Sequence, residues 1–309
     1  MGIMTGDWRL ETGDWRLETG DWRLETGDWR LENYNRDEYN VGMKRPLFRR
    51  IAKRMGWTRS SYYLMSAFLA MVFLIIYVWW PLAEEALAYV DWQGQWWLYM
   101  DWLLLGIFAV MSLLIMAGAD LRVDAWIVFV GMVGGLVIES WGTQTEIWWY
   151  YTAERPPLWI IPAWPIASLS IDRLVRLLRR RSPKYQFANS QPTNLPIYPL
   201  IYWIIFPAFF ALMLTFVWPT VDKSLTVIAI ILVGFLILTP TNHRIAVLTF
   251  VAGSGLGYYL ELWGTTRQCW TYYTLATPPL FAVLAHGMAA VAFWRTARVL
   301  KIVSALVIK

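Results

Sequence analysis

Long runs of apolar residues, separated by short polar or aromatic turns, make up most of this chain. Several runs reach about 20 residues, the length that a helix needs to cross the ~30 Å hydrocarbon core of a bilayer. The pattern therefore predicts an all-α, polytopic membrane protein with about eight transmembrane helices. We expect these helices at residues 62–80, 97–118, 125–141, 158–178, 198–218, 224–240, 244–262 and 279–299.

This hydrophobic pattern occurs twice in the chain. Residues 139–157 read ESWGTQTEIWWYYTAERPP (the first motif), and residues 261–279 read ELWGTTRQCWTYYTLATPP (the second motif). The two align without a gap at a constant offset of 122 residues. We interpret the chain as an internal duplication with two four-helix repeats, residues 62–181 and 198–309, joined by a polar linker at 182–197.

Basic segments indicate how the helices are oriented. Residues 44–59, 176–184 and 295–301 are rich in Lys and Arg, which is typical of cytoplasmic flanks. Residues 44–61 fit a short interfacial segment before the first span. With four spans per half, both motifs then lie on the face opposite the cytoplasm. We therefore expect two parallel repeats in the inner (cytoplasmic) membrane of the cell, with both termini cytoplasmic.

The first 43 residues form a low-complexity tail. Residues 5–32 are four identical copies of TGDWRLE. Trp and Leu lie two positions apart in each copy, about 200° apart on a helix, so the heptad does not build a coiled-coil seam. We interpret residues 1–43 as a tail without a catalytic role. The alternative is a Trp-studded arm that lies on the membrane or on another subunit of a membrane complex.

Composition supports the membrane class and narrows the partners. The chain is 58% apolar and 16% charged, with 22 Trp and 16 Tyr, which suits interfacial aromatic belts. The net charge of +5 is best explained by membrane orientation, so nucleic acid is not an expected partner. One Cys and two His leave little room for a metal cluster, and no metal is expected. The sequence requires no cofactor and leaves open a bound carotenoid or other pigment.

Each motif begins with an acid near the end of an apolar run. A carboxylate within a span costs roughly 2.5–3.5 kcal/mol at the bilayer centre and less near the interface. Glu139 and Glu261 are therefore candidate catalytic residues, because a desolvated carboxyl group that keeps its proton suits a general acid. The alternative is that each glutamate bonds backbone amides of its own loop or pairs with Arg155 or Arg267.

Aromatic residues follow both acids. They form either an interfacial belt or the walls of a cavity whose ring faces stabilise a carbocation or stack along a polyene. The glycines Gly142 and Gly264 predict a turn with positive φ directly after each helix. The candidate substrate-binding residues are Trp141, Trp148, Tyr150, Tyr151, Trp263, Trp270, Tyr272 and Tyr273.

The two halves differ at one informative position. Trp164 in the first half aligns with His286 in the second, about seven residues after the paired prolines. Only the second half therefore combines an acid with an imidazole, which makes His286 a candidate catalytic residue and Trp164 a candidate binding residue. The alternative is that His286 is a packing residue of its span.

At the two motifs the chain resembles the membrane carotenoid hydratase family of the bisanhydrobacterioruberin hydratase type. The resemblance implies a polyene or isoprenoid lipid substrate and a hydratase-like lyase in which Glu261 or Glu139 protonates a C=C bond before water captures the cation. The chain departs from the family pattern where Glu146 and Gln268 replace a glycine, and where Trp replaces a Phe-Gly pair. The matching positions are Glu139, Gly142, Thr145, Tyr150, Tyr151, Glu261, Gly264, Tyr272 and Tyr273.

Two other functions remain open at this stage. The chain fits a non-catalytic subunit of a photosynthetic or respiratory membrane complex, because few residues inside the spans look catalytic. A transporter is the third reading. Transporters normally place ionisable sites near the midplane of the bilayer, whereas both acids here lie near one interface.

Overall fold

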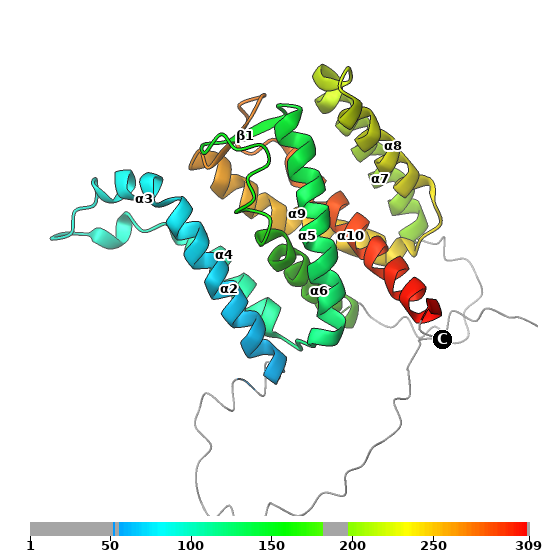
Figure 1. Cartoon of the computed structure of the whole chain (residues 1–309), viewed down its shortest axis with the longest axis horizontal. Helices are drawn as coiled ribbons and strands as arrows, with labels where there is room; N and C mark the ends of the chain where they lie inside the picture. The colour runs from blue at the N-terminus through cyan, green and yellow to red at the C-terminus, as the bar shows by residue number, and fades with distance from the viewer. Residues whose placement is uncertain (1–51, 53–55, 182–196, 308–309) are drawn as a thin grey trace, which may run out of the picture. The chain divides into compact units, whose positions relative to one another are not determined.

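The computed structural model describes residue 52 and residues 56–181 and 197–307 (Figure 1), so the repeat tail, most of the basic segment before the first span and the linker lie outside it. The described residues form nine α-helices, two short 3-10 helices and two short strands. Their bounds are α2 Arg59–Val78, α3 Trp80–Leu87, η1 Trp96–Leu98, α4 Trp102–Met116, α5 Leu121–Gln144, β1 Trp148–Tyr150, α6 Ala163–Arg181, α7 Ile197–Val217, η2 Trp218–Thr220, α8 Ser224–Leu238, α9 His243–Thr266, β2 Trp270–Tyr272 and α10 Leu280–Val307.

Helices occupy all eight regions where apolar runs predicted spans. Five of the described helices are long and apolar enough to cross a membrane, namely α2, α5, α7, α9 and α10. The helices α4 and α8 have 15 residues each, about 22 Å of helix, which is shorter than a hydrocarbon core. The described chain is thus a mostly helical, multi-pass membrane protein.

The helices pack around α5, α6, α9 and α10. In Figure 1, α2 and α4 lie on one side of α5, and α7 and α8 lie on the other. The most extensive packing joins α9 to α10, where Gly253 leaves room for the backbone of Gly287. The pair α5 and α6 packs at Gly131, against the backbone of Pro165. Small residues allow such close approach, which is how helices associate in membranes.

The two motifs meet in a two-stranded antiparallel sheet, which an all-α prediction did not include. Trp148 pairs with Tyr272, Trp149 with Thr271, and Tyr150 with Trp270. Each strand follows the end of its long helix, α5 or α9, so these two helix ends lie at the same side of the bundle. The two aromatic loops are therefore in direct contact.

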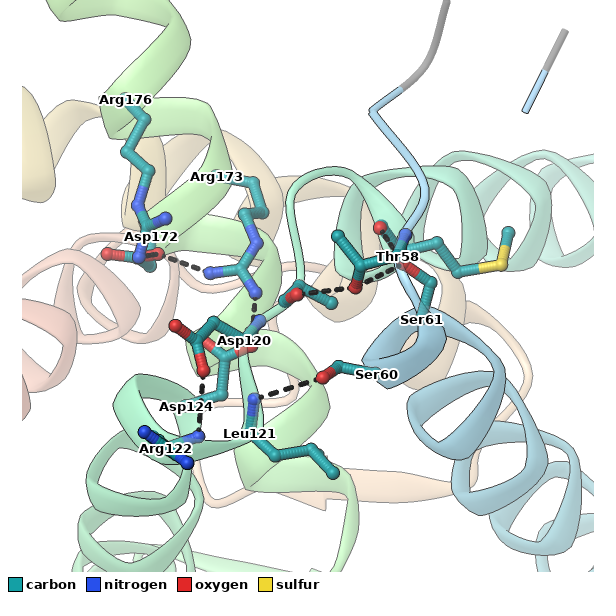
Figure 2. A network of polar contacts seen from close by, with 12 residues as sticks. Thr58, Ser60, Ser61, Asp120, Leu121, Arg122, Asp124, Asp172, Arg173 and Arg176 are labelled. Atoms are coloured by element: carbon teal, nitrogen blue, oxygen red, sulfur yellow. Dashed lines mark hydrogen bonds and ion pairs between the residues drawn. The ribbon is translucent and has the colours of Figure 1, made fainter. Parts of the chain in front are cut away.

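A polar network joins α2, α5 and α6 at the end of α5 opposite the sheet (Figure 2). Arg173 donates to Asp124 and to Asp172, both at 2.6 Å, and the Asp124–Arg173 pair is almost fully buried. Asp124 also accepts from the backbone N–H of Asp120. Asp124 is thus the buried partner of Arg173.

Candidate functional site

The backbone of each motif follows the same path from helix to strand. Five residues after the acid, α5 ends at Gln144 and α9 ends at Thr266. A left-handed residue then turns the chain into the strand: Glu146 has φ 64° and Gln268 has φ 56°. The expected positive φ at Gly142 and Gly264 was wrong, because both glycines lie inside their helices.

Gly142 and Gly264 serve a different purpose, which is to admit a tryptophan ring. A Cβ atom on Gly142 would lie 1.8 Å from Cη2 of Trp148, and one on Gly264 would lie 2.0 Å from Cη2 of Trp270. Real Cβ atoms do not approach other atoms so closely. Glycine is therefore needed at both positions so that each indole can lie flat against its helix and reach the acid one turn earlier.

Glu139 is 3% exposed and is surrounded by hydrogen-bond donors. The indole Nε1 of Trp148 donates to Oε2 at 3.2 Å. The hydroxyl of Tyr150 donates to Oε1 at 3.0 Å, and the indole Nε1 of Trp164 donates to the same oxygen at 3.1 Å. Glu139 is thus held by three side chains from β1 and α6.

Glu261 is also 3% exposed, and its partners are the counterparts of those around Glu139. The indole Nε1 of Trp270 donates to Oε2 at 2.9 Å, and the hydroxyl of Tyr272 donates to Oε1 at 2.9 Å. The third partner is Nε2 of His286, 2.9 Å from Oε1. The imidazole therefore occupies the position that the Trp164 indole takes in the first half.

Neither glutamate forms the alternative contacts considered from sequence. Arg155 instead binds Glu146 at 2.8 Å on the surface, where this hydrogen bond lowers the pKa of Glu146. Arg267 binds Asp101 at 3.1 Å. The described partners of both buried acids are side chains rather than loop amides or arginines.

We call the three side chains around each glutamate its cage: Trp148, Tyr150 and Trp164 around Glu139, and Trp270, Tyr272 and His286 around Glu261. The two cages pack against each other across the sheet. The ring of Trp148 lies 5.8 Å from that of Tyr272, and the ring of Tyr150 lies 5.9 Å from that of Trp270. Trp164 stacks on His286 at 5.8 Å. Burial raises the pKa of Tyr150 and of Tyr272 well above the ordinary phenol value, so both hydroxyls remain protonated donors.

Both acids line one cavity of about 1000 Å³, which we call the chamber. Most of its wall is apolar and comes from α2, α4, α5, α6, α7, α8 and α10, whereas most of its polar groups, though not Thr296 of α10, lie near the sheet. The volume lies at the upper end of the range found for small-molecule sites. Of the predicted site residues, the chamber is lined by Glu139, Trp141, Trp148, Tyr150, Trp164, Glu261, Trp263, Trp270, Tyr272 and His286.

Trp141 and Trp263 join the two halves as well as lining the chamber. The indole of Trp141 donates to Thr226 at the start of α8, at 3.2 Å. The indole of Trp263 donates at 2.7 Å to Asp101, the N-cap of α4. Each motif thus fixes the first turn of a helix from the opposite half.

Tyr151 and Tyr273 were expected to bind substrate, but they are not among the residues that line the chamber. The hydroxyl of Tyr151 donates to the carbonyl of Val78, and that of Tyr273 donates to the carbonyl of Phe216 at 2.6 Å. These carbonyls lie at the ends of α2 and α7, where a helix has no internal donors left. Both tyrosines therefore close helix ends.

Three groups at the chamber were not singled out from the sequence. Ser140 and Gln144 line it near the sheet, and Trp79 lines it from the end of α2. Trp79 packs on Trp263 with ring centroids 4.8 Å apart. Ser140 and Gln144 lie one and five residues after Glu139, which is a different face of α5, so the position of the acid did not point to them.

The described residues contain no cluster of three or more His, Cys, Asp or Glu side chains that could hold a metal ion. What the site offers is two buried carboxyl groups, one imidazole and several aromatic faces around an apolar chamber. No protein-family model, curated protein or solved structure matches this chain.

Proposed function

We propose that this chain is an enzyme of the inner membrane that hydrates a C=C bond of a polyene or isoprenoid lipid held in the chamber. In this proposal it consists of two parallel four-helix halves with cytoplasmic termini. The observation that carries the proposal is the pair of matching cages around Glu139 and Glu261, which differ only where His286 replaces Trp164.

This difference indicates which of the two glutamates acts as the general acid. An indole N–H can only donate, so Trp164 can neither take a proton from Glu139 nor return one. An imidazole can do both, and His286 lies in hydrogen-bond contact with Glu261. Glu261 is therefore the general acid, and His286 is the group through which its proton is replaced. Glu139 completes the opposite wall of the chamber.

The reaction balances with water as the second substrate. The O–H bond of the Glu261 carboxyl breaks, and the π electrons of the alkene form a C–H bond at the less substituted carbon. The tertiary cation that remains faces aromatic rings, among them Trp148 and Trp270, whose π faces attract positive charge. Water then forms the C–O bond, and its released proton returns to Glu261 through His286.

Two features agree with this assignment. Ser140 and Gln144 of α5 also line the chamber and provide polar contacts for the water. In addition, Glu146 and Gln268 have the left-handed backbone that glycine adopts most readily. These are the two positions where the carotenoid hydratase pattern has glycine, so the departure in residue type keeps the backbone shape that glycine would favour.

The proposal is tested with purified protein in vesicles that contain an acyclic carotene. We expect wild-type protein to add one molecule of water to the carotene, detected by mass spectrometry. Glu261→Gln keeps the shape of the side chain but removes the acid, so turnover should fall by about 10²- to 10⁴-fold. Tyr273→Phe, which changes a hydroxyl outside the chamber, is the control and should retain turnover. If Glu261→Gln turns over as fast as the wild type, the assignment is wrong.

A non-catalytic subunit of a photosynthetic or respiratory complex is the second candidate, and the segment between α2 and α4 favours it. This segment exposes several aromatic rings, including Tyr89, Trp92, Trp97 and Tyr99, which suit contact with a partner or with lipid headgroups. Purification distinguishes the two functions. The enzyme should be isolated alone with bound lipid, whereas a structural subunit should be isolated with partners in fixed proportion. A transporter, the third candidate, should move the lipid without changing its mass.

A further inference from the structure

One wall of the chamber is also part of the surface that faces lipid. On α5, Phe129, Val133 and Val137 line the chamber, yet each is about half exposed. On α8, Ile228 and Leu232 do the same. The spacings of four residues place each set on one helix face. The chamber is open to the outside rather than enclosed, and these half-exposed lining side chains place its mouth between α5 and α8.

Hydrogen bonds hold both ends of α8 to neighbouring parts of the chain. Near the sheet, Thr226 accepts from Trp141 of α5, and Lys223 donates to the carbonyl of Thr145 at 2.9 Å. At the other end, Arg295 of α10 donates to the carbonyl of Leu236 and, at 2.7 Å, to the hydroxyl of Thr239. The mouth therefore lies along the middle of α8, where its side chains are apolar.

Behind the mouth, α10 forms a floor that leads to the acid. Ala285, Ala289, Ala292 and Thr296 line the chamber from this helix. Their spacing of three or four residues gives a stripe of small side chains that leaves room above the helix. His286, which contacts Glu261, lies at one end of this floor. From His286 to Thr296 the helix rises about 15 Å.

We propose that the mouth between α5 and α8 is a lateral portal through which the tail of an apolar isoprenoid lipid passes from the bilayer to Glu261. The proposal rests on the function proposed above and adds the route by which the lipid enters. An apolar lipid is concentrated in the bilayer, so access from the side avoids moving it through water. The lining of the portal is apolar from the lipid-facing side chains of α5 and α8 to the floor on α10, which fits a hydrocarbon chain.

The test uses a long-chain isoprenoid alcohol that carries a diazirine at the end of its tail, incorporated in phosphatidylcholine vesicles with the full-length protein. After illumination, mass spectrometry locates the adducts. We expect adducts on the floor of α10, between Ala285 and Thr296. Leu232→Trp fills the portal from α8 and should lower this labelling at least about tenfold, equivalent to about 1.4 kcal/mol of binding free energy. Leu232 is 51% exposed, so the added ring is not forced into a packed core.

Ile231→Trp is the matched control. Ile231 is the neighbouring residue on α8, is 63% exposed and does not line the chamber. It should keep wild-type labelling of α10. Equal labelling in the two variants, or wild-type adducts only outside the portal and its floor, would overturn the proposal.

The labelling is independent of turnover, so the two proposals can fail separately. Glu261→Gln should keep the adducts on α10 while losing hydration. Labelling that Leu232→Trp blocks, together with no water added to any carotene, would leave the portal standing and refute the hydratase. Hydration in vesicles that Leu232→Trp leaves unchanged would refute the portal and leave the hydratase standing.

Discussion

A single methyl group at Gly264 should disturb the site through the ring that lies against it. In Gly264→Ala the new Cβ would lie 2.0 Å from Cη2 of Trp270. The ring must then move, and its 2.9 Å hydrogen bond to Glu261 is lost. The rings of Trp79, Tyr150 and Trp263 pack around that of Trp270 and resist this shift.

The magnitude follows from three contributions. Overpacking a filled core costs about 1–3 kcal/mol. The lost hydrogen bond adds about 0.5–1.5 kcal/mol. Alanine favours a helix over glycine by about 0.8–1 kcal/mol, which offsets part of that cost. We expect Gly264→Ala to lower the free energy of unfolding by about 1–3 kcal/mol.

Gly255→Ala is the matched control, because Gly255 lies on the same helix and a Cβ there would meet nothing within 4 Å. It should be neutral or stabilising by up to about 1 kcal/mol. The assay is unfolding by sodium dodecyl sulfate in mixed micelles, followed by circular dichroism. Equal stability of the two variants would refute the reasoning, since it would mean that the Trp270 ring does not lie against Gly264.

Three further predictions concern other parts of the structure. Burial raises the pKa of the Cys269 thiol to about 12, so N-ethylmaleimide at pH 8 should label the wild type only after denaturation; rapid labelling of the folded protein would contradict this. Asp124→Ala leaves the buried Arg173 with only Asp172 and should cost about 3 kcal/mol in the same unfolding assay, whereas an unchanged stability would show that the pair is not buried. His286→Trp copies the first half and should fold normally but lose turnover by about 10²-fold or more, and a fully active variant would exclude His286 from proton transfer.

The positions of the helices could be predicted from the sequence because they depend on local properties. A run of apolar residues long enough to span lipid forms a helix wherever it occurs, since its backbone groups have no other partners there. The number that cross the membrane was harder to predict. The predicted runs at α4 and α8 include residues such as Asp101 and Pro240 that lie outside the helices, so the helices are shorter than the runs.

The short sheet could not be predicted in the same way. Its strands have three residues each and come from loops 122 residues apart, so neither would be stable alone. A signal was nevertheless present. In both motifs a Trp and a Tyr stand nine and eleven residues after the acid, and the spacing of two places both rings on one face of a strand. That spacing predicts two donors aimed in one direction, toward the glutamate.

The two halves have different residues at one aligned position, Trp164 beside Glu139 and His286 beside Glu261. We attribute the different roles proposed for the two glutamates to this one difference. The donors from the strand, Trp148 with Tyr150 and Trp270 with Tyr272, hold the two acids alike, so they explain burial but not a difference in chemistry. The third position differs, and there the only change is from a group that donates to one that can also accept. Both cages line the same chamber, so in the proposed hydration one lipid chain can contact both, and one acid that can be reprotonated is sufficient for turnover.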